Sequence, residues 1–158
     1  MRHVFRPIFM VATLLFCFLM VNDSYAQRLE NNVPIAVMEA FQKKFPIKDP
    51  VWFSEFHGRF DQKLTFEARF MFDNRYSRAY YDSEGNMKAF AATVETKELP
   101  AKATAYMKEN YPTFPIAEAI MVTHSSQKVE YEVGIYIDGV FSVVTFSKDG
   151  DFIKMGRG

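Results

Sequence analysis

Two stretches of the sequence decide the expected fold: FEARFMFDNRYSRAYYDSEGN at residues 66–86 and YEVGIYIDGVFSVVTFSKDGD at residues 131–151. Aligned with a shift of 65 residues, they carry aromatic or aliphatic residues at mostly the same places. They are identical at these anchor positions: Glu67 and Glu132, Asp73 and Asp138, Ser77 and Ser142, and Gly85 and Gly150. One short chain therefore uses the same pattern twice, which bears directly on its architecture.

Each stretch is predicted to form a β-hairpin. Apolar residues recur at every second position on both sides of its centre, which is typical of half-buried strands. The dipeptides Asp73-Asn74 and Asp138-Gly139 suit two-residue turns, and such a turn fixes the register of its strands. The register puts the following mostly apolar pairs on one face: Phe72 with Arg75, Phe70 with Ser77, Ala68 with Ala79, Phe66 with Tyr81, Ile137 with Val140, Ile135 with Ser142, Val133 with Val144, and Tyr131 with Phe146.

A helix bounded by prolines is predicted before each hairpin. NNVPIAVMEAFQKKFP (31–46) has one proline near its start and one at its end, and Val37, Phe41 and Phe45 recur at helical spacing. ELPAKATAYMKENYP (98–112) has the same outline. We expect these helices to pack on the apolar face of the hairpins.

The remaining apolar runs predict further strands, which complete the expected fold class. They are VWFSEF (51–56), MKAFAATV (87–94), AIMVTH (119–124) and FIKM (152–155). Together the elements predict an α+β fold of two tandem α-β-β-β-β repeats, at about residues 31–95 and 97–158, with helices packed on one face of an antiparallel sheet.

The first 26 residues are predicted to be a secretory signal peptide that is cleaved after Ala26. Arg2 and Arg6 precede an apolar run at residues 8–21, and Ser24 and Ala26 have the small-x-small spacing of a cleavage site. The run is shorter than the ~20 residues that span a bilayer, which argues against a membrane anchor.

The composition of the remaining chain excludes some classes of partner. Residues 27–158 are predicted to form a single domain, and Cys17 leaves with the leader, so the mature chain carries no cysteine. Lys and Arg number 19 in the full sequence and Asp and Glu also 19. This balance gives no electrostatic reason to expect nucleic acid or an anionic membrane as partner. We expect a monomer in the periplasm or outside the cell, without membrane insertion after cleavage.

The second face of the hairpins is the candidate protein-binding surface. A purely solvated face would be mostly Lys, Glu, Thr and Ser, whereas this one carries side-chain types that are enriched at protein interfaces. Its candidate residues are Glu67, Arg69, Met71, Tyr76, Arg78, Tyr80, Tyr136 and Phe141. The alternative is that cross-strand aromatic pairs on this face only stabilise the sheet, by about 0.2–1 kcal/mol each.

The sequence carries no motif for catalysis, a metal or a cofactor. His57 and His124 stand alone, and a lone histidine at a strand end is mostly solvated or hydrogen-bonded. The acidic turns at residues 82–85 and 149–151 lack the alternating ligands of an EF-hand loop. A pair formed by Glu67 and Glu132 is conceivable, but the pattern does not require the two carboxylates to be close. We expect a protein that is not an enzyme and holds no metal or cofactor.

The V-P start and F-P end of the helix, the aromatic strand and the glycine turn, used twice behind a signal peptide, resemble the PepSY-like proteins. These proteins are also described as having a beta-lactamase-inhibitor-like fold. The resemblance covers nearly all of residues 27–158 and implies helices on one face of an antiparallel sheet and an open second face. In the beta-lactamase inhibitory protein such a concave face grips an enzyme, and PepSY domains proper are associated with peptidase propeptides. The mature chain differs from that inhibitor because it lacks cysteine.

The expected function is that of an exported binding module whose open sheet face binds an envelope or extracellular protein, with inhibition of an enzyme as one outcome. An envelope carrier or sensor of a small ligand is the alternative, and it requires a lined cavity. A scaffold that acts with a neighbouring protein is a third hypothesis.

Overall fold

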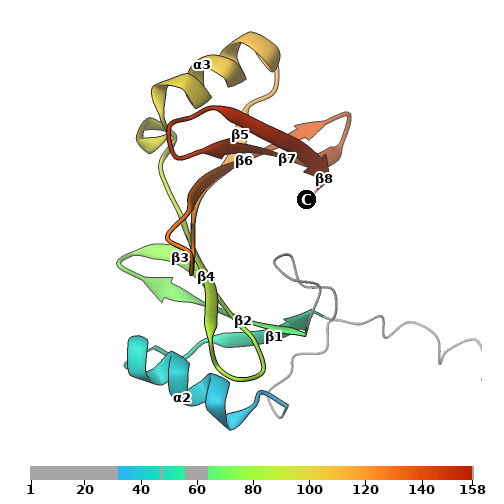
Figure 1. Ribbon diagram of the computed structural model, residues 1–158. Coiled ribbons are helices and arrows are strands. Elements are labelled where there is room, and N and C mark those ends of the chain that lie inside the picture. The colour runs from blue at the N-terminus through green and yellow to red at the C-terminus, as the bar shows by residue number, and fades with distance from the viewer. Residues whose placement is uncertain (1–31, 47, 56–63, 158) are drawn as a thin grey trace, which may run out of the picture.

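The computed structural model describes residues 32–46, 48–55 and 64–157 (Figure 1). This part of the chain contains the α-helices α2 (Ile35–Lys44) and α3 (Ala101–Asn110) and a 3-10 turn, η1 (Thr96–Glu98). Its strands are β1 (Val51–Glu55), β2 (Thr65–Phe72), β3 (Arg75–Tyr81), β4 (Met87–Thr93), β5 (Ile116–His124), β6 (Val129–Ile137), β7 (Val140–Ser147) and β8 (Phe152–Arg157). Neither described α-helix combines the length and the apolar character that crossing a membrane requires. The predicted signal peptide and His57 lie outside the described residues.

The strands form one 8-stranded sheet in the order β1-β2-β3-β4-β5-β6-β7-β8. Every neighbouring pair is antiparallel. The two halves of the sheet are joined where β4 pairs with β5, from Ala89 opposite His124 to Thr93 opposite Ile120. This pairing satisfies backbone groups that would otherwise form two free strand edges.

The predicted fold class is therefore wrong. The described chain is not two helix-packed α-β-β-β-β repeats but one continuous antiparallel sheet that carries two α-helices of 10 residues each. The helices stay short because prolines bound them: Pro34 and Pro100 occupy the N-cap positions, and Pro46 and Pro112 follow the C-caps. Proline cannot continue a helix, since it lacks the N–H donor. Such short helices cover parts of the sheet and do not form a second layer over all of it.

The two hairpin registers predicted from the turns are confirmed. β2 pairs with β3 from Phe66 opposite Tyr81 to Phe72 opposite Arg75, and β6 pairs with β7 around the turn Asp138-Gly139. Asp73 and Asn74 have φ values of 48° and 60°, and Asp138 and Gly139 have φ values of 49° and 79°. Two successive residues with positive φ are the signature of the tight turn that joins twisted strands.

Each helix covers one apolar part of the sheet, on the outer side of its curve (Figure 1). Val37 and Phe41 of α2 and its C-cap residue Phe45 pack with buried residues of β2 and β3, and partly buried Trp52 of β1 joins them. From α3, Ala103 and Met107 pack with buried residues of β5, β6 and β7. We call the side of the sheet that carries the helices the convex face, and the opposite side the concave face.

Two turns that contain glycine, one between β3 and β4 and one between β7 and β8, lie in close contact with the helices. Gly85 has φ +85°, and a Cβ atom placed on it would lie 2.5 Å from the carbonyl oxygen of Ala36 in the first turn of α2. Gly150 has φ +86°, and its Cβ would lie 2.8 Å from the backbone nitrogen of Ala103 in α3. Both positions thus require glycine for the backbone conformation and for the close approach of a helix.

Candidate functional site

The eight predicted site residues all lie on strands, and the register places them on the concave face. Glu67, Arg69 and Met71 of β2 stand opposite Tyr80, Arg78 and Tyr76 of β3, and Tyr136 of β6 stands opposite Phe141 of β7. β3, β4 and β5 separate β2 from β6. The structure therefore divides the predicted site into a group on β2 and β3 and a pair on β6 and β7.

Glu67 is buried and forms ion pairs with two partly exposed arginines on the same face of the sheet. Its residue exposure is 3%. Arg69 donates from Nε and Nη2 to the two carboxylate oxygens of Glu67, at 2.9 and 2.8 Å, and Arg78 Nε lies 4.0 Å from Glu67 Oε1. The hydrogen bond with Glu67 raises the pKa of Arg69 above its ordinary value. Arg69 also lies over the Phe53 ring of β1, with Cζ 3.9 Å from the ring centroid.

Tyr80 is likewise buried, at 6% exposure, and belongs to a small apolar cluster on the concave face. The other members of this cluster are Ala89, Ala91, Ile120 and Val122. They come from β4 and β5, whose pairing the sequence analysis did not predict. The apolar run at the start of residues 119–124 was the one available signal for the contribution of β5.

The exposed part of the predicted site lies at the turn ends of the two hairpins. Met71 is 53% exposed, its cross-strand partner Tyr76 is 43% exposed, and Tyr136 is 57% exposed. Phe141 is partly buried, and its ring centroid lies 5.1 Å from that of Tyr136. Because neighbouring strands are antiparallel throughout, β2 and β6 run in the same direction, so both pairs lie at the same end of the sheet. We call Met71, Tyr76, Tyr136 and Phe141 the hairpin-end patch.

A second polar group lies at the other end of β5 and β6. His124 Nε2 lies 2.7 Å from Glu130 Oε2, and Lys128 Nζ lies 2.7 Å from Glu130 Oε1. Burial raises the pKa of Glu130, but hydrogen bonds from Lys128 and His124 outweigh this effect and hold the pKa below its ordinary value. The prediction that His124 is either solvated or hydrogen-bonded is confirmed, and the hydrogen bond with Glu130 is the alternative that holds. Glu132 and Glu67 lie on strands that are separated by three others, so they do not form the conceivable carboxylate pair.

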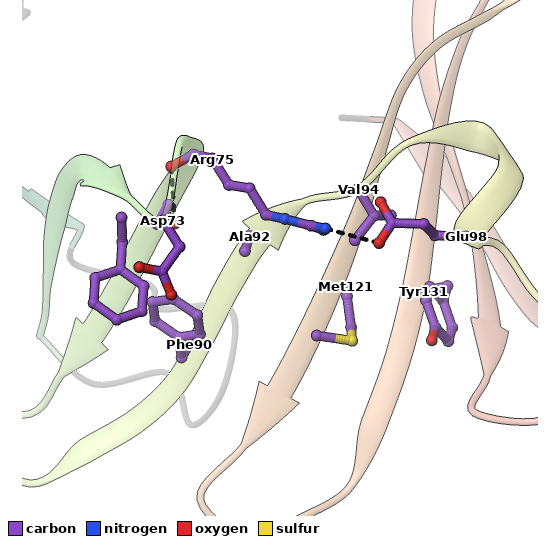
Figure 2. A pocket seen from close by; sticks show the side chains of 10 residues that line it. Asp73, Arg75, Phe90, Ala92, Val94, Glu98, Met121 and Tyr131 are labelled. Atoms are coloured by element: carbon purple, nitrogen blue, oxygen red, sulfur yellow. Dashed lines mark hydrogen bonds and ion pairs between the residues drawn. The ribbon is translucent and has the colours of Figure 1, made fainter.

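The convex face has a groove between the parts of the sheet that the two helices cover. Its volume is about 360 Å³, and Figure 2 shows its apolar floor and polar rim. The lining residues are Phe72, Asp73, Arg75, Ser77, Phe90, Ala92, Val94, Glu98, Met121 and Tyr131. The sequence analysis missed this groove because its floor requires the pairing of β4 with β5.

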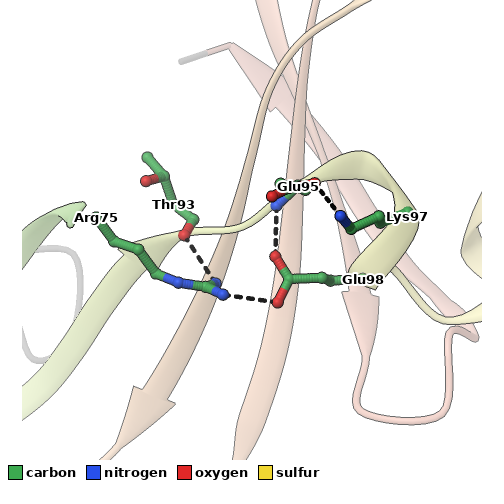
Figure 3. Close-up of polar contacts among 5 residues, drawn as sticks. All are labelled: Arg75, Thr93, Glu95, Lys97 and Glu98. Atoms are coloured by element: carbon green, nitrogen blue, oxygen red, sulfur yellow. Dashed lines mark hydrogen bonds and ion pairs between the residues drawn. The ribbon is translucent and has the colours of Figure 1, made fainter. Parts of the chain in front are cut away.

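Arg75 closes one end of this groove by bridging to the segment after β4 (Figure 3). Its Nη2 donates to Glu98 Oε1 at 2.7 Å and its Nη1 donates to the carbonyl oxygen of Thr93 at 3.2 Å. Glu98 Oε2 accepts a further hydrogen bond from the backbone N–H of Glu95 at 2.7 Å. The hydrogen bond from Arg75 holds the pKa of Glu98 below its ordinary value. Among the described residues, no group of three or more His, Cys, Asp or Glu side chains could hold a metal ion.

No protein-family model matches the chain, and no curated protein matches it either. Solved structures from Bacteroides share its fold. A protein of Bacteroides eggerthii, provisionally described as periplasmic, aligns with a TM-score of 0.69 at 11% identity, covering 80% of this chain and 90% of that chain. A Bacteroides uniformis protein described as a DUF2874 family protein aligns with a TM-score of 0.67 at 14% identity, covering 78% of this chain and 88% of that chain.

A Bacteroides fragilis protein described as BLIP-like gives a TM-score of 0.57 at 18% identity, covering 77% of this chain and 84% of that chain. At these identities the comparison establishes the fold and carries no residue roles. The chain therefore has a BLIP-like fold, as the sequence resemblance implied, in the form of one curved antiparallel sheet.

Proposed function

We propose that the chain is an exported binding module whose concave face binds a protein through the hairpin-end patch. One observation carries the proposal: large apolar side chains remain exposed at the same end of one sheet face, on two separate hairpins. Tyr and Met give a large contact area, and aromatic anchors contribute most of the energy in many interfaces. The BLIP-like fold supports this choice of face by analogy only.

The location of the ion-pair cluster supports different roles for two groups of residues on the concave face, one positioning the patch and the other contacting the partner. Glu67 contacts both Arg69 and Arg78, so the three side chains hold β2 and β3 in place beside the exposed pair Met71 and Tyr76. Side chains that are already rigid lose less conformational entropy when a partner binds. In this proposal the cluster positions the patch, and the exposed aromatic residues make the contacts.

The finer parts of the proposal concern family, partner and location. A PepSY-like relationship fits the helix and turn motifs, and restraint of an envelope peptidase or another enzyme would then be the consequence of binding. We further propose a periplasmic or secreted protein that is monomeric and has no catalytic activity. Export is tested by sequencing the N-terminus of the protein from the cell-envelope fraction: a start at Gln27 supports it, and a start at Met1 contradicts it.

The patch is tested with the double variant Tyr76→Ser/Tyr136→Ser. A photo-crosslinking residue at position 141 captures the partner in the envelope, and the purified partner is then titrated against both proteins. Two lost anchors of about 1.4 kcal/mol each weaken binding about a hundredfold. The matched control is Ile35→Ser/Met38→Ser, which changes two exposed residues of α2, at 69% and 42% exposure, outside the patch. If both double variants weaken partner binding equally, the proposed role of the patch is contradicted. It is also contradicted if neither variant weakens partner binding.

A small-ligand carrier is the second candidate function, and the convex groove is the observation that favours it. A volume of about 360 Å³ lies within the range of small-molecule sites. Ala92→Phe would fill the floor of the groove while leaving the concave face unchanged. If an apolar fluorescent probe binds the unchanged protein and not this variant, the groove is a ligand site. Binding that is equal in both proteins excludes it.

A further inference from the structure

β8 ends the sheet and leaves one of its edges open. Its six residues, Phe152–Arg157, are all exposed, unlike those of any other described strand. β7 pairs with one edge of β8, and within residues 32–46, 48–55 and 64–157 no strand pairs with the other. An open strand edge presents N–H and C=O groups in a row and is a template for a further strand.

The hairpin turn before β7 determines which backbone groups of β7 face β8. In a hairpin with a two-residue turn, the residues that flank the turn, here Ile137 and Val140, form a hydrogen-bonded pair. Hydrogen-bonded and non-hydrogen-bonded pairs then alternate along an antiparallel ladder. Val140, Ser142 and Val144 therefore direct their N–H and C=O groups to β6, and the residues between them direct theirs to β8.

The same alternation continues across β8. Lys154 stands opposite Thr145 and Gly156 opposite Val143, so these two β8 residues direct their backbone groups to β7. The N–H and C=O groups of Met155 and Arg157 consequently point to the open edge. Met155 is 38% exposed, and its sulfur lies 3.1 Å from the hydroxyl of Tyr111, the C-cap residue of α3, which places its side chain on the convex side.

The charged residues of β8 determine which charge an added strand must carry to bind at this edge. Lys154 and Arg157 are its charged residues, and both are basic and exposed. Their opposite partners on β7, Thr145 and Ser142, place Lys154 on the concave side and Arg157 on the convex side. A second copy of β8 would bring two more cations to this edge, whereas an acidic strand would complement both.

We propose that the open edge of β8 binds an extended acidic segment of a partner protein as an additional antiparallel strand. Backbone groups of Met155 and Arg157 would supply the hydrogen bonds, and carboxylates near Lys154 and Arg157 would set the preference. An apolar residue opposite Met155 would add to the apolar row that Phe152 and Met155 form beside α3. The β8 edge contains none of the four residues of the hairpin-end patch, although Arg157 stands opposite Ser142, the chain neighbour of Phe141. The inference rests on the edge and its charges, so it does not depend on the proposed function.

The probe is a fluorophore-labelled, end-blocked hexapeptide with the residues Glu, Thr, Val, Glu, Val and Tyr, titrated by anisotropy against the exported chain. The control peptide has Lys in place of both Glu residues. Reversing two cross-strand charge pairs changes the binding free energy enough to weaken binding about tenfold. The charge-reversed protein Lys154→Glu/Arg157→Glu should invert this preference and bind the Lys peptide more tightly.

The backbone role is tested with Met155→Pro and its matched control Met155→Ala. Proline removes the outward N–H but no hydrogen bond to β7, and it is tolerated at sheet edges. We expect Met155→Pro to abolish peptide binding and Met155→Ala to retain it, with circular dichroism showing that both variants are folded. Hydrogen exchange should slow at Met155 and Arg157 when the acidic peptide is bound. Three results would overturn the proposal: no binding of the acidic peptide, equal binding of both peptides, or a β8-mediated dimer of the chain in sedimentation that Met155→Pro dissociates.

Discussion

The contact between the turn at Gly85 and the start of α2 gives the sharpest stability prediction. Replacing Gly85 by Ala puts a Cβ atom 2.5 Å from the carbonyl oxygen and 2.9 Å from the carbonyl carbon of Ala36. Both are backbone atoms, which no rotamer change can move away. The residue also has φ +85°, where a side chain is strained. Gly85→Ala therefore combines a conformational penalty with a steric one.

Gly139 separates these two penalties. It has φ +79°, but a Cβ placed there meets nothing within 4 Å. Gly139→Ala should thus lower the free energy of unfolding by about 1 kcal/mol, from backbone strain alone. Gly85→Ala should lower it by about 3 kcal/mol, since overpacking in a close contact adds about 1–3 kcal/mol. Gly150→Ala, with φ +86° and the Ala103 nitrogen 2.8 Å away, should resemble Gly85→Ala.

Urea unfolding followed by tryptophan fluorescence measures the difference. Trp52 is the single tryptophan, and its ring lies 5.4 Å from that of Phe41 in α2, so it reports on the part of the core that Gly85 supports. At typical urea dependences, a difference of about 2 kcal/mol separates the two midpoints by about 1 M. Equal midpoints for Gly85→Ala and Gly139→Ala would refute the claim that the helix contact is what requires glycine.

Three further predictions concern titratable groups. The Tyr81 hydroxyl is buried and has no hydrogen-bond partner among the described residues, so Tyr81→Phe should raise the free energy of unfolding by about 1 kcal/mol. Urea unfolding measures this change, and a decrease would contradict the prediction. Burial raises the pKa of Tyr81 to about 12, whereas an unfolded tyrosine ionises near pH 10. The unfolded state therefore releases this proton first, and stability should fall between about pH 10 and pH 12 by a few kcal/mol, less steeply in Tyr81→Phe. For Glu130, whose pKa is lowered in the folded chain, the stabilisation is present above its ordinary pKa and is lost as the pH falls through the folded value. Thermal unfolding of Glu130→Gln should accordingly show a weaker loss of stability below about pH 4.5 than the unchanged chain.

Local patterns were sufficient to predict the hairpins and their faces. The turns Asp73-Asn74 and Asp138-Gly139 set the register, and the register alone places Met71, Tyr76, Tyr136 and Phe141 on one side of their strands. Which of the face residues are exposed did not follow from the pattern. Glu67 and Tyr80 alternate in phase with Met71 and Tyr76 but are buried, because exposure depends on what neighbouring strands and the curve of the sheet bring near them.

The pairing of β4 with β5 could not be predicted for a similar reason. η1 and α3 lie between these strands in the chain, so no turn dipeptide specifies their register. The fold class predicted from the repeated pattern was wrong because a pattern within each half cannot reveal how two halves join. The convex groove depends on the same pairing, since residues of β3, β4, β5 and β6 line it.

The sequence by itself determined what short-range interactions control: where prolines bound the two helices, where positive-φ residues turn the chain, and which residues share a strand face. Only the tertiary structure decided that the described strands form one curved sheet, that Glu67 is buried between Arg69 and Arg78, and that one edge of β8 has no partner strand within the described part of the chain. The reason is physical. Turns and caps are fixed by neighbours in the chain, whereas burial, sheet continuity and edges arise from contacts between residues that are far apart in it.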